Sequence, residues 1–244
     1  MKFYGIRPSL DKKIVGKFFQ SERIANYMKD EPKFLNNIFF EKIEFEPITP
    51  KAILHKKAKV TDLISNVNAG GNLHLLMSRK LRDILIKYRE VGIQFFKSVI
   101  VMSGNEEINN YFSLNVFIDN NEFIDIKSSI VRYDKKSDDY KLTYRTEVEY
   151  KQFDDFESFN DALQIANQNL ETFYIEKIKL VDIITENFFM LRHVEGGVKY
   201  VVSEKLKKEI EDTGCTGIEF QPVELSLNEW LQDGGVRERI YGKA

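Results

Sequence analysis

The stretch VVSEKLKKEIEDTGCTGIEF, residues Val201–Phe220, describes a complete structural unit. An apolar strand leads into Ser203, whose hydroxyl is placed to accept a hydrogen bond from the free backbone N–H groups of a first helical turn. Leu206 and Ile210 then recur at helical spacing among charged residues. The pattern predicts a strand followed by a short, serine-capped helix with one buried side.

Glycines mark the second half of this unit. Gly214 follows the last helical residue, where glycine commonly ends a helix in the left-handed conformation. Gly217 stands directly before the apolar segment Ile218–Phe220, where a missing side chain permits positive φ or close backbone approach. The unit is therefore predicted to be strand, helix, glycine turn and strand.

A looser copy, LMSRKLRDILIKYREVGIQF, occupies Leu76–Phe95. A shift of 125 residues aligns the two copies without a gap, serine with serine and glycine with glycine. Arg89 stands where the second copy has its helix-ending glycine, so the two helices need not end alike. Nothing in such a unit performs chemistry, and we assign structural roles to Ser78, Gly92, Ser203, Gly214 and Gly217.

Length and polarity allow two organisations of the chain. Its 244 residues suffice for one large domain or two small ones. Because residues Ser103–Asn110 are polar enough to form a hinge, we expect an N-terminal lobe, 1–102, with the first unit and a C-terminal lobe, 103–244, with the second. A single domain spanning 1–244 is the alternative.

The remaining segments predict an α+β fold of mainly antiparallel strands and hairpins with several short helices. We expect helices at 21–28, from Ser158 with Asp161 as its capping partner, and from Ser226 with Glu229 as its capping partner. Strands are expected at 39–45, 99–102, 111–118, 122–130, 131–134, 140–150, 188–194 and 198–202, a loop at 65–72, a turn at 135–139 and a loosely held tail at 236–244.

Charge and composition exclude several classes of protein. The chain has 36 Lys and Arg residues and 38 Asp and Glu residues, so its net charge does not favour binding to nucleic acid or to an anionic membrane. The first ten residues are broken by Gly5, Arg7 and Pro8 before a signal-peptide core develops. A single cysteine excludes an intramolecular disulfide. We expect a cytoplasmic protein.

Recognisable catalytic motifs are absent from the sequence. His55, His74 and His193 stand far apart, without metal-ligand spacing, and His74 between apolar residues is typical of a structural histidine. Cys215 follows a predicted helix end, where the helix dipole disfavours a thiolate. Neither a phosphate-binding loop, a dinucleotide-binding loop nor a G-x-S-x-G motif occurs. No catalytic residue, metal or cofactor is predicted.

Two segments resemble a known family. The second copy, with V-S-E-K-L and then T-G-I-E-F-Q-P-V, is similar to the closing segment of immunity protein family eleven of bacterial polymorphic toxin systems. YFSLNVFIDNNEFIDIKSS, Tyr111–Ser129, resembles the central segment of that family. The resemblance covers roughly Asp62–Val223. It implies a cytoplasmic protein that binds a cognate toxin, made by the same cell or its kin, and inhibits it without turnover.

The segment EVEYKQFDDFESFND, Glu147–Asp161, is the charge feature that best suits a partner. Carboxylates around aromatic anchors fit a basic surface such as the cleft of a nuclease toxin. We assign partner binding to Glu147, Glu149, Tyr150, Phe153, Asp154, Asp155, Phe156 and Glu157. Helix capping and a solvated face explain the same residues equally well, because acidic groups complement the start of a helix.

Two other functions stay open at this point. The chain is an alternative candidate for an enzyme of unrecognised type, with Glu147, Glu149 and Asp125 as dispersed acid–base groups. A general protein-interaction module is the other alternative. The sequence does not determine the oligomeric state or the identity of the toxin.

Overall fold

A computed structural model describes residues 1–66, 73–137 and 145–243 of the chain. The strands are β1 (Phe3–Pro8), β2 (Ser21–Ile24), β3 (Lys51–Leu54), β4 (Leu63–Ile64), β5 (Leu76–Ser78), β6 (Ile93–Val101), β7 (Glu107–Val116), β8 (Ile130–Lys136), β9 (Thr146–Lys151), β10 (Thr172–Lys177), β11 (Phe188–Val194), β12 (Gly197–Ser203) and β13 (Ile218–Pro222). The helices are α1 (Lys12–Val15), α2 (Arg79–Ile86), α4 (Phe156–Gln168), α5 (Glu204–Asp212), α6 (Leu227–Leu231) and α7 (Val236–Tyr241). Three short 3₁₀ helices are η1 (Leu35–Asn37), η2 (Asn121–Phe123) and η3 (Ile126–Ser128).

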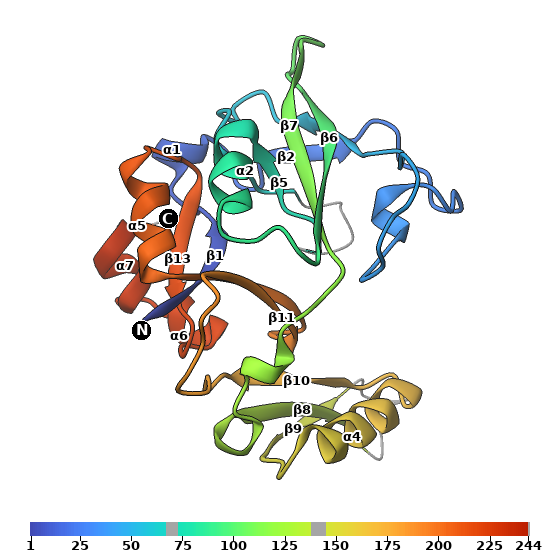
Figure 1. The fold of residues 1–244 in the computed structure, drawn as a ribbon, viewed down its shortest axis with the longest axis vertical. Coiled ribbons are helices and arrows are strands. Elements are labelled where there is room, and N and C mark those ends of the chain that lie inside the picture. Colours follow the sequence, from blue (N-terminus) through green and yellow to red (C-terminus); the bar gives the residue numbers. More distant parts are fainter. Residues whose placement is uncertain (67–72, 138–144, 244) are drawn as a thin grey trace.

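The strands form two sheets. One has seven strands in the order β13-β1-β12-β11-β10-β8-β9, and the other has six in the order β2-β3-β6-β7-β5-β4. Pairing is antiparallel except between β3 and β6 and between β10 and β11. In Figure 1 the six-stranded sheet lies in the upper part of the molecule, and β8, β9, β10 and α4 form the lower part. The predicted α+β class is confirmed.

Both copies of the repeated phrase form the same unit. Ser78 accepts a hydrogen bond from the Leu81 backbone N–H at 3.3 Å, and Ser203 accepts one from Leu206 at 3.2 Å. The glycine before each second strand has a positive φ, 78° for Gly92 and 79° for Gly217. The strand–helix–strand units are therefore β5-α2-β6 and β12-α5-β13.

The repeat extends further than the sequence indicates. In the hairpin β4-β5, Leu63 lies opposite Met77, and in the hairpin β11-β12, Phe188 lies opposite Val202. These two registers are related by the same shift as the copies themselves. Each unit therefore begins one strand earlier than the predicted phrase.

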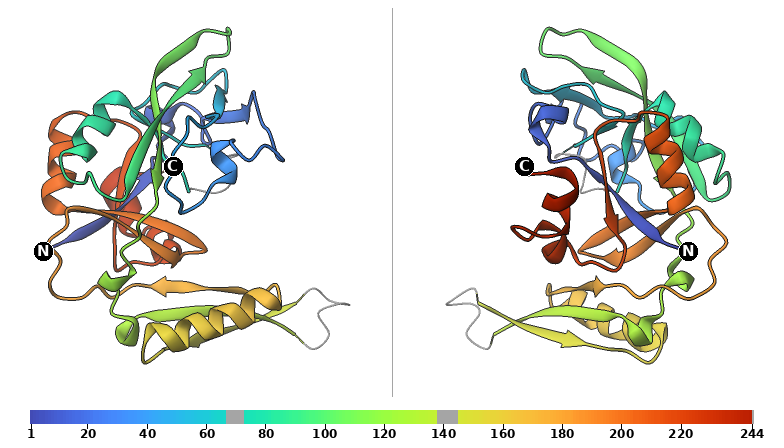
Figure 2. Two further views of the ribbon diagram at one scale, coloured as in Figure 1. Left: turned by 45° about the vertical axis from the view of Figure 1, so that its right-hand side comes forward. Right: turned by 90° about the vertical axis from the view of Figure 1, so that its left-hand side faces the viewer.

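A fourth strand completes each unit, but the two units take this strand from different parts of the chain. In the first unit β7 lies between β5 and β6, which gives the order β4-β5-β7-β6. In the second unit β1 takes that place, which gives β11-β12-β1-β13. The registers agree, since Phe95 pairs with Leu114 as Phe220 pairs with Ile6. The first strand of the chain thus completes its C-terminal unit (Figure 2).

One hydrophobic core joins the two units. Leu81 and Leu85 from α2 pack in the same buried cluster as Leu206 and Ile210 from α5. Figure 1 shows the two helices side by side. Burying such a side chain contributes about 1.5–3 kcal/mol. The two helices cover a core to which both sheets contribute.

The sheets do not follow the expected division at Met102. Strands β6 and β7 form one hairpin across that position, so the polar segment expected as a hinge contains a turn and the start of β7. In addition, β1 belongs to the sheet built mainly from later residues. Hydrogen bonding between distant segments, which no local pattern reveals, causes both departures.

A second core lies under α4. Its centre is Phe159, which is fully buried against residues of β8, β10 and β11. The helix begins three residues earlier than predicted because Asp155, and not Ser158, is its N-cap. Leu170 follows the end of the helix and is exposed.

Three other local predictions are wrong. Residues 21–24 form a strand rather than a helix, because they pair with β3. Residues 39–45 form no strand, since the Gln94 side chain bonds both the N–H and the C=O of Ile43 in place of a neighbouring strand. Residues 122–129 contain the end of η2 and all of η3 instead of a strand, Asp125 caps η3, and only Ile130 lies in a strand, as the first residue of β8.

The C-terminal segment is also ordered differently from the prediction. The α6 helix begins after Ser226 with Glu229 as its capping partner, as predicted. Residues 236–241, expected to be a loose tail, form α7, which is held by a buried arginine discussed below. Most of the predicted loop at 65–72, and parts of the predicted turn at 135–139 and strand at 140–150, lie outside the described residues.

Candidate functional site

The acidic segment Glu147–Asp161 spans two elements, the edge strand β9 and the start of α4. Its aromatic residues separate into two kinds. Phe153 and Phe156 are half-buried and stand edge-on to Phe159, with ring centroids 5.7 and 5.9 Å away. Tyr150, by contrast, is 60% exposed. Of the three predicted aromatic anchors, Tyr150 is the most open to a partner.

The acidic residues also separate by role. Asp155 accepts a hydrogen bond from the Ser158 backbone N–H at 2.8 Å, and this bond lowers the pKa of its carboxyl. Glu149 forms an ion pair of 3.1 Å with Lys151. Glu147, Asp154 and Glu157 are exposed. Helix capping therefore accounts for Asp155, while these three exposed carboxylates give the surface its negative charge.

The backbone of β9 presents hydrogen-bonding groups to solvent. The N–H of Ser137, directly after β8, donates to the Arg145 carbonyl, whereas the N–H of Lys136, the last residue of β8, donates to Glu171, away from β9. Antiparallel ladders alternate between hydrogen-bonded and non-hydrogen-bonded pairs. Lys136 lies opposite Thr146, so the residues at 146, 148 and 150 direct their N–H and C=O groups away from β8.

Two apolar side chains accompany this open edge. Val148 is 48% exposed, and it lies with Tyr150 on the sheet face opposite α4, because their β8 partners alternate with the core residue Tyr133. Throughout residues 1–66, 73–137 and 145–243, the outward edge of β9 has no strand partner. We call Val148, Tyr150 and the outward backbone of residues 146–150 the β9 edge.

Each of the other three sheet edges has a backbone N–H group that is hydrogen-bonded outside its sheet. On β13 the Phe220 N–H donates to the Tyr241 hydroxyl at 2.9 Å. On β4 the Leu63 N–H donates to the Thr216 carbonyl at 3.2 Å, and on β2 the Ser21 N–H donates to the Ser65 carbonyl at 3.1 Å. Unpaired edges invite pairing with another chain and are usually protected. The β9 edge therefore differs from the other three.

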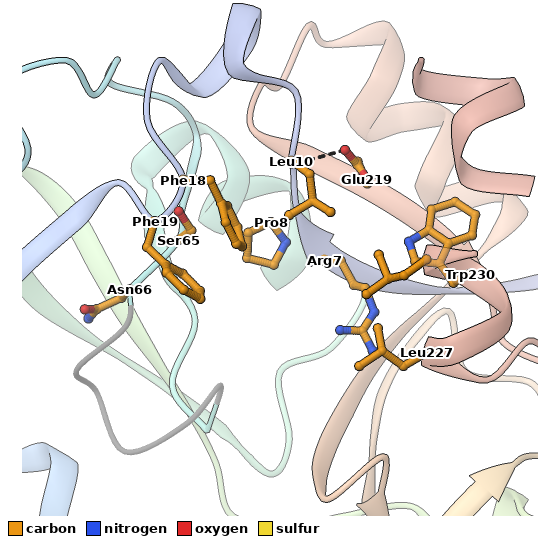
Figure 3. Close-up of a pocket in the computed structure, with 11 residues that line it drawn as sticks. Arg7, Pro8, Leu10, Phe18, Phe19, Ser65, Asn66, Glu219, Leu227 and Trp230 are labelled. Carbon is orange, nitrogen blue, oxygen red and sulfur yellow. Dashed lines mark hydrogen bonds between the residues drawn. The ribbon is translucent and has the colours of Figure 1, made fainter. Parts of the chain in front are cut away.

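A pocket of about 290 Å³ lies on another part of the molecule (Figure 3). It opens between β1, the segment before β2, residues 65 and 66, and α6. Its wall is mainly apolar, with polar groups at a few positions. The residues that line it are Arg7, Pro8, Leu10, Phe18, Phe19, Ser65, Asn66, Glu219, Leu227, Trp230 and Leu231.

Buried charges lie behind the pocket wall. Arg7 and Lys199 both bond the carboxylate of Glu195, and Lys199 does so at 2.9 Å. Burial lowers the pKa of Lys199, while Glu195 opposes that shift. Beside them Arg237 and Glu219 form a bidentate ion pair with distances of 2.8 and 2.7 Å. These pairs keep the charged groups hydrogen-bonded in a place from which water is largely excluded.

His74 has structural partners, and the surroundings of Cys215 disfavour its thiolate. His74 has its ring nitrogens 3.1 Å from the carbonyl oxygens of Leu114 and Ile38, and burial lowers its pKa. Burial raises the pKa of Cys215 to about 11, in the predicted direction. Among the described residues, no three His, Cys, Asp or Glu side chains form a group suited to a metal ion.

The pocket was not anticipated from the sequence. Its walls come from five separate stretches of the sequence, so no local spacing indicates it. A partial signal exists, since Arg7 and Glu219 lie in otherwise apolar strands beside Ile6 and Phe220. Charged residues are almost never fully buried unless they are paired. A charged residue within an apolar strand therefore indicates an ion pair.

Comparisons with known proteins give no assignment. No model of a protein family matches the chain, and no curated protein matches it either. In the part of the chain that the structure describes, no helix combines the length and the apolar character required to cross a bilayer. Any function must therefore be argued from the resemblance and from the surfaces described above.

Proposed function

We propose that this protein is a cytoplasmic immunity protein that binds and neutralises a cognate bacterial toxin without catalysis. The β9 edge is the observation that carries the proposal. It combines backbone groups that have no strand partner among the described residues with exposed apolar side chains, and it has exposed carboxylates nearby. The resemblance of Tyr111–Ser129 and Val201–Val223 to an immunity family supports the same function.

The β9 edge fits recognition by strand addition. An extended segment of the toxin adds to β9, with main-chain hydrogen bonds giving affinity and side chains giving specificity. Val148 and Tyr150 provide apolar contact on one face. The carboxylates of Glu147, Asp154 and Glu157 favour a basic partner, because complementary charge speeds encounter and disfavours wrong partners. We therefore expect the partner to be a basic toxin that exposes an extended segment or an edge strand.

Proline substitution tests this mode of binding. Val148→Pro removes an N–H group that points away from β8, so the ladder between β8 and β9 persists. Glu149→Pro is the matched control, since its N–H points toward β8 and the substitution breaks that ladder. We expect V148P to retain a melting temperature close to that of the wild type, while E149P lowers it.

The functional readout is protection of cells. The reading frames adjacent to this gene are searched for a toxin-like product, which is co-expressed with the wild type or V148P, and complex formation is measured by co-purification. Wild-type protein is expected to rescue growth and co-purify, and V148P to bind at least about tenfold more weakly. Failure of the wild type in both assays contradicts the immunity function for that pair. Full rescue by folded V148P leaves the function intact and contradicts strand addition.

A further inference from the structure

Two lysine-rich segments that lie far apart in the sequence meet on the surface of the protein. The first contains α1 and the residues after it, and the second is the turn that follows β3. The Lys59 backbone N–H donates to the Val15 carbonyl at 2.9 Å, and Nζ of Lys59 donates to the Lys13 carbonyl at 2.7 Å. A Cβ on Gly16 would lie 2.0 Å from the Lys57 carbonyl oxygen, so the two backbones are in direct contact. The two segments therefore form one surface.

This surface carries a local excess of positive charge. Residues 11–22 and 55–60 contain six lysines and only two acidic residues, Asp11 and Glu22. All six lysines are exposed, and we call them the lysine patch: Lys12, Lys13, Lys17, Lys56, Lys57 and Lys59. The nearly equal numbers of acidic and basic residues in the whole chain conceal this local excess.

The lysine patch differs from other basic positions in its lack of carboxylate partners. Elsewhere Lys51 pairs with Glu107 at 3.0 Å, and Lys87 pairs with Glu209 at 2.8 Å. Within residues 1–66, 73–137 and 145–243, no lysine of the patch forms an ion pair. Like charges that lie close together raise the local potential, and an anionic partner lowers it.

Exposed apolar side chains accompany the lysines in the same two segments. Ile14 is 38% exposed, Phe19 is 43% exposed and Val60 is 42% exposed. Val15 and Ala58, in contrast, are buried, so the segments are anchored to the body of the protein. The surface thus offers both positive charge and apolar groups to a partner.

We propose that the lysine patch binds the surface of a lipid bilayer that contains anionic lipids. Clusters of about four to eight basic residues are typical of binding to anionic lipids. Ile14, Phe19 and Val60 enter the boundary between headgroups and acyl chains, as apolar side chains of interfacial proteins do.

The composition of the patch favours lipid over nucleic acid. Proteins that bind nucleic acid commonly use the planar fork of arginine and stack bases on aromatic rings. The patch consists of lysines, and two of its three exposed apolar neighbours, Ile14 and Val60, are aliphatic. Aliphatic side chains cannot stack on bases, but they lose contact with water when they enter a bilayer.

The lysine patch and the β9 edge are separate surfaces. Figure 1 shows α1 in the upper part of the molecule and β9 in its lower part. Contact between the patch and a bilayer therefore leaves the β9 edge accessible. The proposal does not depend on toxin binding, and its test uses no toxin.

Vesicle sedimentation with the full-length protein tests the proposal. Sucrose-loaded vesicles consist of phosphatidylcholine alone or of phosphatidylcholine with about 30% phosphatidylglycerol. We expect saturable binding to the anionic vesicles and none to the neutral vesicles. Because salt screens exposed charges, binding should weaken steeply between about 50 and about 300 mM NaCl.

A triple substitution locates the contact. Lys12→Gln, Lys56→Gln and Lys57→Gln remove three charges whose side chains have no hydrogen bond or ion pair within the described residues. Each lysine near an anionic surface strengthens binding about fivefold, so the triple variant should bind about 100-fold more weakly. Its melting temperature should stay close to that of the wild type.

The matched control changes the net charge equally at positions outside the patch. Lys127, Lys179 and Lys208 are also exposed, and the triple variant K127Q/K179Q/K208Q should bind anionic vesicles nearly as the wild type does. A further variant, I14S/V60S, tests the apolar contribution. It should bind the vesicles several-fold more weakly and keep the salt dependence of the wild type.

The decisive measurement uses the wild type alone and therefore survives poor folding of a variant. Absence of binding to anionic vesicles at low salt, or equal binding to neutral vesicles, overturns the proposal. Equal weakening by the two triple variants shows attraction through net charge and overturns the patch as the contact. If the wild type binds single-stranded DNA through the same lysines and does not bind vesicles, the lipid assignment is wrong.

Discussion

Asp62 occupies in the first unit the place that Asn187 occupies in the second. The Ser78 hydroxyl lies 2.6 Å from Oδ1 of Asp62, and the Ser203 hydroxyl lies 2.7 Å from Oδ1 of Asn187. The backbone N–H groups of the same serines donate to the corresponding carbonyls at 2.8 and 2.9 Å. Each capping serine is thus held by a second residue, one strand earlier in the chain.

The charge on Asp62 gives the first unit an additional connection. Its Oδ2 accepts a hydrogen bond from the Thr216 backbone N–H at 2.8 Å and pairs with Lys80 at 3.0 Å. Burial alone would raise the pKa of Asp62, but the bonds from Ser78, Thr216 and Lys80 outweigh it, and the net pKa is lowered. The native state therefore favours the ionised form.

Acidification should remove this contribution. Because its native pKa is lowered, Asp62 stabilises the fold fully above its unfolded pKa of 3.8, and the contribution is lost as pH falls through the native pKa. Asp62→Asn should cost about 1–2 kcal/mol at pH 7. The difference in unfolding free energy between wild type and D62N should shrink below about pH 4. A difference that stays constant from pH 7 to pH 2.5 contradicts the assignment.

Two glycines with similar backbone angles should respond differently to alanine. Gly214 has a φ of 70° and open space around it, whereas a Cβ on Gly217 would lie 2.4 Å from the Thr61 hydroxyl and 2.6 Å from the Leu63 carbonyl. Gly214→Ala should cost about 1 kcal/mol for the left-handed conformation. Gly217→Ala should cost about 1–3 kcal/mol more through crowding. If both variants lose the same free energy of unfolding in urea, the backbone around Gly217 moves enough to accommodate a Cβ without crowding.

The ion pair between Arg237 and Glu219 should be strongly coupled. Both side chains are nearly inaccessible, 3% and 1% exposed. Arg237→Met leaves a buried carboxylate unpaired and should cost about 3–5 kcal/mol. Adding Glu219→Gln should recover a large part of that loss, since the amide oxygen still accepts from Leu10. If R237M lowers the unfolding free energy by less than about 1 kcal/mol, α7 does not stabilise the sheet through this pair.

Charge reversal near the β9 edge should separate binding from capping. Asp154 and Glu157 are exposed, whereas Asp155 caps α4. The double variant D154K/E157K should bind the toxin more weakly, with the association rate most affected at low salt. Its melting temperature should remain close to that of the wild type. Asp155→Ala should instead lower the melting temperature and leave the affinity for the toxin unchanged. An unchanged affinity of the double variant would exclude Asp154 and Glu157 from the interface.

Local signals in the sequence predicted the repeated units well. Ser203, Leu206 and Gly217 each satisfy a requirement that arises within a few residues, namely a cap, a buried helix side and a positive φ. The capping box of Ser226 and Glu229 is of the same kind. Such features depend only on neighbouring residues, so they can be predicted without knowing the rest of the fold.

Pairing between distant segments explains the failures. Residues 21–24 have a helix-like pattern, yet β3 makes them a strand. The tail was predicted to be loosely held, but Arg237 forms an ion pair with the buried carboxylate of Glu219 on β13. The pocket and the β9 edge depend on which strands are neighbours. No spacing within one segment carries that information.

The position of β1 in the second sheet affects how the chain is made. During synthesis β1 leaves the ribosome well before both of its neighbours, β12 and β13, because about 190 residues separate it from them in the chain. The first unit, whose strands are contiguous, is free to fold while translation continues. The second unit must wait with an unpaired apolar strand at the opposite end of the chain. Closure of its sheet therefore has to wait until β12 and β13 have been synthesised, and during this delay β1 is exposed to chaperones or to other nascent chains.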